Sequence, residues 1–502
     1  MWIKLGADLM VDLDSISKEI ERFHCEKEIE FYLNRSGLKD EMNLSSIYQK
    51  YRHLFREDLI LNVKAERQRA SGDKERRLRH LQMFLASNHL EMAVKELTDK
   101  FETMEAQENV RVDFEEIPFR LAAVKMANEP DRTLRGKIYA ARNSVIERIN
   151  VILQERMRKL HETARKLGYE DYVALYRDIK GIDLYSLEQV MRDFIDRTDR
   201  LYTKTMREFV RARLGIELEV AEKHDISYLF RGRAFDSYFK GEEMVPALKR
   251  TLNGIGIKLD EQENVDLDTV ERPKKSPRAF VAAIKVPDDV KLVVMPIGGY
   301  DDYTTLFHEA GHAEHFGSVD PCLEVEYKYL GDSSVTESFA FLFEYLVHDE
   351  NWLATYIQID RLEEYLDFAY LNKLFFLRRY GAKLSYELKL HRDSLEGMDE
   401  AYKTTLEAAL KFIHPRSHYL SDVDDGFYCA QYLRAWILET QLRAFLKDRF
   451  GEKWFNSPNA GRFLKDLWSK GQKYDAVEIA QTLGYDGLDP NMLAREIEQH
   501  FC

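Results

Sequence analysis

The stretch HEAGHAEH, which begins at His308, has the residue types and the spacing of a catalytic metal site. If Asp301 or Asp302 caps a helix here, His308 and His312 are four residues apart and project from the same face, so both imidazoles can bind one metal ion. Glu309 lies about 100° further around the helix, where it can flank the metal and act as general base for an activated water. The alternative is a surface helix that carries two histidines on one side by chance.

A third ligand must come from elsewhere, because catalytic zinc takes three protein ligands and leaves a fourth position open. The segment Gly331–Glu350 has a helical pattern and contains Glu337 and Glu344, seven residues apart and on one face. One of these acids can bind the metal while the other holds a ligand histidine by a hydrogen bond. Ser334 and Glu337 also match a capping box, which needs no metal. The rival ligands are Glu324, Glu326 and Asp332.

Helices must position these residues, because only 11 Pro and 24 Gly interrupt a chain of 502 residues rich in helix formers. Apolar residues recur at three- and four-residue intervals over Leu13–Gly37, for example. Hydrophobic residues make up 45% of the chain, which excludes general disorder. We predict an N-terminal helical region over residues 1–110 and a helical catalytic region over residues 111–502.

One segment breaks the helical pattern just before the histidines. Residues 253–277 mix turn formers, charges and prolines, and residues 278–300 then predict two short strands with a turn at Pro287. Such a hairpin either aligns an extended peptide by backbone hydrogen bonds or merely covers the helix. It leads into Gly298 and Gly299, which are candidates for binding a substrate backbone because glycine permits close approach.

The composition limits which binding partners and which cellular location we expect for the protein. The net charge of −14 argues against a nucleic-acid partner, which needs a basic face. Cys25, Cys322, Cys429 and Cys502 lie far apart without a C-x-x-C pair, as is typical of reduced thiols. The first 15 residues lack the apolar core of a signal peptide, and no run reaches the length of a membrane span. We therefore predict a cytoplasmic protein that does not bind membranes.

The motif and the acid that follows it match a known family. LFHEAGHAEHF followed by ESFAFLFE, with Glu337 twenty-nine residues after His308, resembles the thimet oligopeptidase and oligoendopeptidase F family of zinc metallopeptidases. The metal helix of that family has the form H-E-x-G-H-A-x-H. The resemblance implies one zinc ion held by His308, His312 and Glu337, with Glu344 in support. Zinc aminopeptidases and thermolysin-type enzymes place the third ligand closer, so the spacing discriminates.

The resemblance continues in DDGFYCAQYLRAW, which looks like the tyrosine-bearing helix of the family. It implies that Tyr428 and Tyr432, four residues apart and thus on one helical face, stabilise the oxyanion of the transition state. Ordinary aromatic packing is the alternative. Many family members also carry a His five or six residues before the first tyrosine, where this chain has Val423 and Asp422. The nearest histidine, His418, is out of register.

By this resemblance the fold is mainly α, a large two-lobed helical body with a deep substrate channel and a small β-hairpin or sheet next to the metal helix. The implied activity is hydrolysis of internal bonds in short unfolded peptides, with Glu309 as general base. One alternative is a zinc carboxypeptidase in which Arg416 or Arg434 binds the free C-terminus. Another is a non-catalytic helical metal-binding protein, although a structural site does not need Glu309. No pattern in the sequence specifies an oligomeric state.

Overall fold

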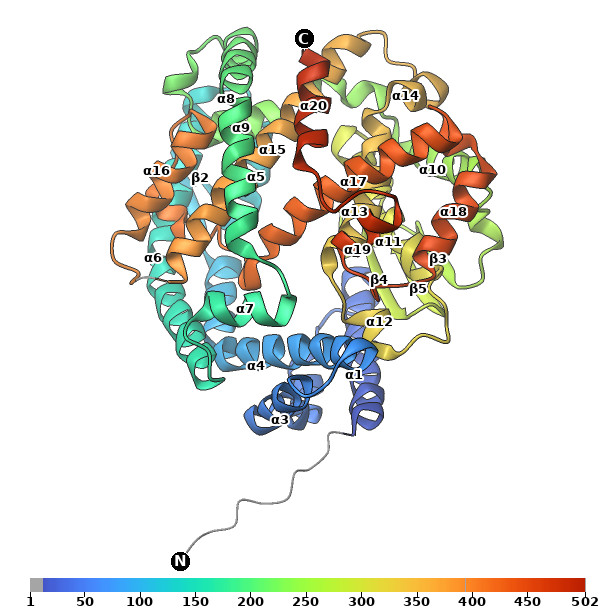
Figure 1. The fold of residues 1–502 in the computed structure, drawn as a ribbon. Coiled ribbons are helices and arrows are strands. Elements are labelled where there is room, and N and C mark those ends of the chain that lie inside the picture. Colours follow the sequence, from blue (N-terminus) through green and yellow to red (C-terminus); the bar gives the residue numbers. More distant parts are fainter. Residues whose placement is uncertain (1–11, 393, 502) are drawn as a thin grey trace, which may run out of the picture.

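The computed structural model describes residues 12–392 and 394–501, and most of them are helical (Figure 1). This part of the chain contains twenty α-helices and five strands, which form one two-stranded and one three-stranded sheet. The prediction of a mainly α fold is confirmed. Each described helix is too short or too polar to cross a lipid bilayer. Cys502 and most of the N-terminal stretch without a signal-peptide pattern lie outside the described residues.

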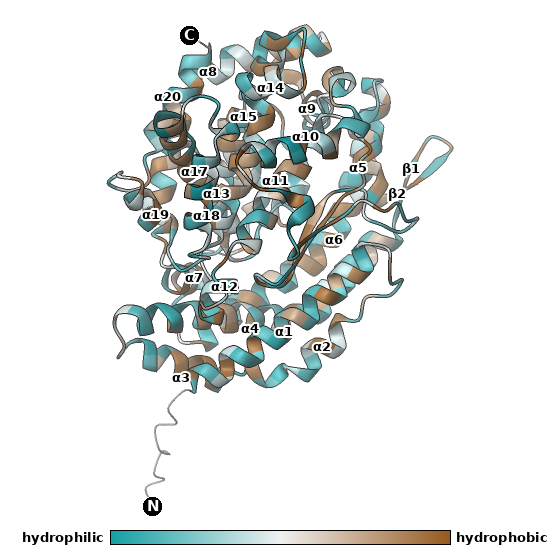
Figure 2. Cartoon of the chain, turned by 90° about the vertical axis from the view of Figure 1, so that its right-hand side faces the viewer, coloured by the Kyte–Doolittle hydropathy of each residue, from teal (hydrophilic) through white to brown (hydrophobic). Residues whose placement is uncertain are grey.

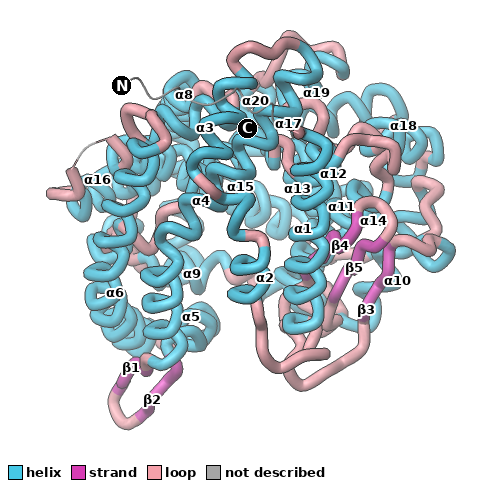
Figure 3. The backbone as a smooth tube through the Cα atoms, turned by 90° about the horizontal axis from the view of Figure 1, so that it is seen from below, coloured by secondary structure: helices cyan, strands magenta, loops and turns pink. Residues whose placement is uncertain are grey.

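The N-terminal half supplies nine helices and a small hairpin. The helices are α1 (Leu13–Arg35), α2 (Leu44–Lys50), α3 (Glu57–Arg67), α4 (Gly72–Gln107), α5 (Phe119–Asn128), α6 (Arg132–Lys166), α7 (Tyr172–Lys180), α8 (Leu184–Leu214) and α9 (Lys223–Phe230). The hairpin, which projects from the body (Figure 3), consists of β1 (Asn109–Val112) and β2 (Glu115–Pro118). The helical prediction misses this hairpin because each strand has only four residues.

The C-terminal half supplies the other eleven helices of the described residues and a three-stranded sheet. The helices are α10 (Gly241–Gly254), α11 (Tyr300–Gly317), α12 (Val325–Tyr329), α13 (Ser333–Glu344), α14 (Glu350–Tyr356), α15 (Leu362–Leu390), α16 (Met398–Leu410), α17 (Tyr428–Phe450), α18 (Pro458–Trp468), α19 (Ala476–Thr482) and α20 (Pro490–Phe501). The strands are β3 (Val265–Asp268), β4 (Phe280–Lys285) and β5 (Asp289–Val293).

Buried apolar side chains form two large clusters, and apolar and polar surfaces alternate on most helices around them (Figure 2). The first cluster joins the N-terminal helices to α16 and most of α15, and the second joins β3 and β5 to α10, α11, α14 and α18. α13, α15 and α17 contribute side chains to both clusters. In Figure 1, α6 and α16 lie on the left, α10, α11 and α18 lie on the right, and α4 runs beneath them. The predicted boundary after residue 110 falls within the first cluster.

The predicted hairpin before the histidine motif is confirmed, because β4 and β5 pair antiparallel. β3 adds to the other side of β5 in parallel, giving the strand order β3-β5-β4. The turn-rich pattern of residues 253–277 conceals β3, which has four residues of which two are aspartates. β4 is therefore an edge strand, and it lies against α11, which carries the histidines.

α11 and α13 approach so closely that no side chain fits at their crossing. A Cβ atom at Gly311 would lie 2.5 Å from the carbonyl oxygen of Phe339 and 2.7 Å from Cα of Ala340. The apolar face of α11 is buried in the second cluster. The glycine of HEAGH thus permits the contact that places Glu337 of α13 opposite the histidines.

The start of α11 differs from the prediction. Gly299 is the N-cap residue, so Asp301 and Asp302 lie in the first turn and do not cap the helix. The N–H of Tyr300 donates instead to Oδ1 of Asp236, at 3.1 Å, which comes from an earlier part of the chain. An aspartate therefore accepts a hydrogen bond from the N-terminal end of α11, as a cap would. Because this aspartate is distant in the sequence, the residues around the helix start do not predict it.

Candidate metal centre

Helices α11 and α13 bring His308, His312 and Glu337 to one point. One potential ligand atom from each of them lies within 4.8 Å of the other two. Oε2 of Glu337 lies 3.4 Å from Nε2 of His308 and 3.7 Å from Nε2 of His312. Two imidazoles and a carboxylate that converge in this way are a ligand set for zinc, which binds nitrogen and oxygen donors and keeps a fourth position open in catalytic sites.

Glu337 supplies a buried atom that has no donor in the protein. Its Oε1 accepts a hydrogen bond of 2.6 Å from the hydroxyl of Tyr428, whereas its Oε2 is buried without a hydrogen-bond partner. A buried carboxylate oxygen without a donor is costly. Because that oxygen faces two imidazole nitrogens, a bound cation would satisfy it. The donor set therefore fits zinc; cobalt and manganese also bind such ligands.

The capping-box interpretation of Glu337 is wrong. The N-cap of α13 is Asp332, whose side chain accepts from the N–H of Ser334 at 3.0 Å. Ser334 therefore lies inside the helix, and Glu337 is directed to the histidines. The rival ligands lie elsewhere, since Asp332 and Glu326 form ion pairs with arginines and Glu324 is the N-cap residue of α12.

The Nδ1 atom of each histidine has its own hydrogen-bond partner on α13. Nδ1 of His308 lies 2.7 Å from Oε2 of Glu344, as predicted for a supporting acid. Nδ1 of His312 lies 2.8 Å from Oγ1 of Thr336. Both contacts leave Nε2 for a metal ion and fix the orientation of the ring. Sequence reasoning missed Thr336, because a threonine carries no metal-ligand signal of its own.

In the absence of a cation, the carboxylates of Glu337 and Glu344 favour the protonated form of His308. Burial opposes its protonation, but the neighbouring carboxylates of Glu337 and Glu344 outweigh burial and hold the pKa of His308 well above its ordinary value. Burial lowers the pKa of His312 to about 4. Zinc binds neutral imidazole, so a divalent cation bound by Nε2 of His308 would take the place of the proton on that nitrogen.

Glu309 lies beside this group without belonging to it. Its Oε2 accepts a hydrogen bond of 3.0 Å from the N–H of Val281 on the edge strand β4. Burial raises the pKa of Glu309 to about 7. A carboxylate that is held at one oxygen and has a pKa near neutrality is suited to general-base catalysis.

The two predicted tyrosines lie on the first two turns of α17. Tyr428 is its first residue and donates to Glu337, and Tyr432 packs edge to face against Tyr428 with 5.0 Å between the ring centroids. Burial, followed by the charge of Glu337, raises the pKa of both phenols above the ordinary value. Both hydroxyls therefore stay protonated and can donate hydrogen bonds at neutral pH.

Packing and backbone conformation explain why Gly298 and Gly299 are glycines. A Cβ at Gly298 would lie 2.5 Å from the backbone nitrogen of Gly241, and Gly298 and Gly299 both have positive φ. The N–H of Gly298 donates to Asp302 and that of Gly299 donates to the carbonyl of Phe239. Their role in substrate binding stays a prediction, and these N–H groups are already used within the protein.

A cavity of about 690 Å³ opens beside the metal centre. Thr336 and Tyr428 belong to its wall, which otherwise comes largely from α4, α6, α7 and the segment before α13. Its volume lies within the range of roughly 300–1,000 Å³ that is typical of small-ligand pockets. The cavity therefore borders the site on the side of the N-terminal helices.

Two histidines from the sequence analysis do not reach the metal centre. His418 hydrogen-bonds to Lys223 at 2.9 Å and to Asn143 at 3.0 Å. His315, the last histidine of the motif, is fully buried and lies 3.3 Å from the carbonyl oxygen of Gly471. His315 therefore belongs to the core beneath α11.

A second group of possible ligands is an ion-pair network. Ligand atoms of Glu387, Asp424 and Cys429 also lie within 4.8 Å of one another. Nζ of Lys383, however, lies 2.8 Å from Asp424 and 3.9 Å from Glu387. The ammonium supplies the positive charge that a metal ion would bring.

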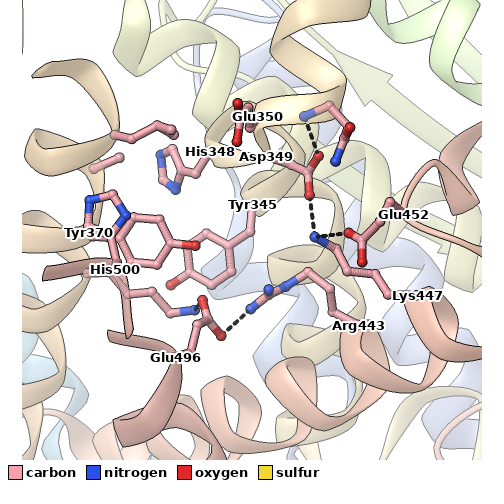
Figure 4. Close-up of a pocket in the computed structure, with 14 residues that line it drawn as sticks. Tyr345, His348, Asp349, Glu350, Tyr370, Arg443, Lys447, Glu452, Glu496 and His500 are labelled. Atoms are coloured by element: carbon pink, nitrogen blue, oxygen red, sulfur yellow. Dashed lines mark hydrogen bonds and ion pairs between the residues drawn. The ribbon is translucent and has the colours of Figure 1, made fainter. Parts of the chain in front are cut away.

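A smaller cavity, of about 230 Å³, is lined by α15, α17, α20 and the segment after α13 (Figure 4). Its cations are paired with carboxylates. Lys373 and Arg443 lie 3.3 and 2.7 Å from Glu496, and Lys447 lies 2.8 Å from Asp349. No cation in this cavity is left to bind an anionic ligand.

Comparison with known proteins finds neither a protein-family model nor a curated protein that matches the chain. The resemblance to the oligopeptidases therefore rests on the motif and its spacing to Glu337, and family membership stays a prediction.

Replacing Glu344 by glutamine is expected to weaken zinc binding by roughly 10- to 100-fold, because the amide holds His308 without a negative charge. The stoichiometry should remain one ion per chain, since the three ligands are intact. Titration against a chelator of known affinity measures the change. Glu363→Gln, at an exposed position of α15, is the control. Equal affinities of the two variants would contradict the role of Glu344.

Proposed function

We propose that the protein is a zinc-dependent oligopeptidase that hydrolyses internal bonds of short peptides. The observation that carries the proposal is the buried, donor-free Oε2 of Glu337 facing Nε2 of His308 and His312, with Glu309 close by but outside the ligand group. A purely structural metal site has no use for an uncoordinated acid beside its three ligands.

Zinc bound at this centre would supply a Lewis acid that lowers the pKa of a water molecule and polarises a peptide carbonyl. Glu309, held by the N–H of Val281, then accepts the proton of the attacking water. The same carboxyl group passes that proton to the departing amine.

Tyr428 and Tyr432 are proposed to donate hydrogen bonds to the oxyanion that forms on the carbonyl. Tyr428 donates to Glu337 in the structure, so its hydroxyl would exchange this partner for the substrate oxygen. Both phenols are protonated at neutral pH and can therefore donate.

A peptide substrate is supported by the strand beside the base. β4 is an edge strand, and its Val281 N–H and Ala283 carbonyl bond to side chains instead of to another strand. An extended peptide can add to an edge strand by backbone hydrogen bonds, and at these two groups of β4 it would have to take the place of Glu309 and His24. The neighbouring cavity is far too small for a folded domain, which supports a short or unfolded segment as the substrate.

The test is hydrolysis of an internally quenched peptide that is blocked at both ends. We expect cleavage by the zinc-loaded protein, loss of cleavage after dialysis against a chelator, and recovery when one equivalent of zinc is returned. Mass spectrometry of the products locates the cleaved bond. Cleavage that survives removal of the metal would show that the proposed mechanism is wrong.

A further inference from the structure

The cavity beside the metal centre contains a cation whose partners among the described residues are neutral, namely Gln431 and the ring of Tyr176, whose centroid lies 5.6 Å from the ammonium nitrogen. Lys180, the last residue of α7, lines this cavity, and its Nζ donates to Oε1 of Gln431 at 2.7 Å. No carboxylate of the described residues forms an ion pair with it, although such pairs are frequent elsewhere in the protein. Burial lowers the pKa of Lys180 to about 8, so the group is still mostly protonated at neutral pH.

The other cations considered for substrate binding are occupied. Arg156, which lines the same cavity, is paired with Asp425. Arg434, one of the two arginines of the carboxypeptidase alternative, lies 2.9 Å from Asp332 and is therefore already paired. The other predicted arginine, Arg416, is half-exposed at its side chain and is paired with Glu400.

Lys180 is also well placed relative to the reacting groups. Its partner Gln431 and the proposed oxyanion donor Tyr428 are three residues apart on α17 and line the same cavity. Three residues correspond to about 4.5 Å along a helix axis. A group bound by Lys180 would therefore lie about one helical turn from the side chain that contacts Glu337.

We propose that the Lys180 ammonium binds a carboxylate of the peptide substrate, with Gln431 as its neutral support. This inference rests on the proposed peptidase function and names the substrate class: peptides that carry a negative charge a short distance from the cleaved bond. The carboxylate is either the C-terminus or an Asp or Glu side chain. A charge-assisted hydrogen bond in a partly dehydrated cavity is strong enough to select such peptides.

Four quenched peptides of one sequence separate the two sources. They combine a free or amidated C-terminus with a Glu or Gln near the cleaved bond. For the wild type, we expect kcat/KM to fall roughly 10- to 100-fold when the recognised carboxylate is neutralised. Lys180→Met should abolish that difference by lowering the rate only for the charged peptide, mainly through KM. Lys180→Arg should restore part of the preference.

Lys166→Met, which removes an exposed lysine of α6, controls for the loss of one charge. Binding of the same peptides to Glu309→Gln, measured by titration calorimetry, gives a readout that does not require turnover. If the wild type cleaves nothing while the charged peptide still binds more tightly in a Lys180-dependent way, the peptidase proposal fails and the Lys180 site stands. If Lys180→Met weakens binding and cleavage of all four peptides equally, Lys180 is only structural and the inference is overturned.

Discussion

Replacing Glu309 by glutamine is expected to lower kcat/KM for peptide hydrolysis by roughly 10²- to 10⁴-fold, the usual contribution of a general base. The amide cannot accept the proton of the attacking water. The hydrogen bond from Val281 can still be accepted by the amide oxygen, and Glu309 is not among the three grouped ligands, so zinc should remain bound in one equivalent. Initial rates with the blocked quenched peptide and metal analysis of the same sample provide the measurement.

Glu314→Gln is the matched control for this variant. Glu314 lies on the same helix, is buried, and has a pKa raised by burial to about 7, but it bonds to Gln262 and is not among the grouped ligands. We expect this control to keep the wild-type rate. Equal rates of the wild type and Glu309→Gln would assign the base to another residue or the cleavage to a contaminant.

The metal helix could be predicted because its information is local. The four-residue spacing of His308 and His312 fixes their common face, and the pattern of α11 fixes which face is buried. The spacing to Glu337 came from a family resemblance, whereas local rules alone favoured a capping box equally well. Only the tertiary contact of α11 with α13, which Gly311 permits, decides between the two.

The features that could not be predicted are those that distant segments supply. Thr336 supports His312 only because α13 crosses α11, and Asp236 takes the place of the expected cap only because an earlier loop folds against the helix. The character of Lys180 depends on which side chains surround it. A lysine at the end of an amphipathic helix is ordinary in a sequence, and the cavity and the neutral partner make it unusual.

Glu337→Gln is expected to weaken zinc binding more than Glu344→Gln does, because it removes the negative charge of a proposed ligand. For the wild type, zinc at about 1,000 times its Kd should stabilise the fold by about 4 kcal/mol, which corresponds to roughly 4 °C in Tm for a chain of this length. The variant should show no such shift. Scanning calorimetry with and without zinc measures both values and does not depend on turnover.

The metal-free variant should be less stable than the metal-free wild type, because the Glu337 carboxylate stabilises the charge of protonated His308, from which its Oε2 lies 3.4 Å. Glutamine can keep the hydrogen bond from Tyr428, so the variant should still fold. A cooperative unfolding transition without zinc, combined with a lost response to zinc, separates a ligand from a residue that merely supports the fold. Glu324→Gln, at the acid that rivals Glu337 in the sequence, should keep the full zinc response. If zinc no longer raises the Tm of Glu324→Gln but still raises that of Glu337→Gln, the third ligand is Glu324. Glu337 would then lie beside the histidines without binding the metal ion.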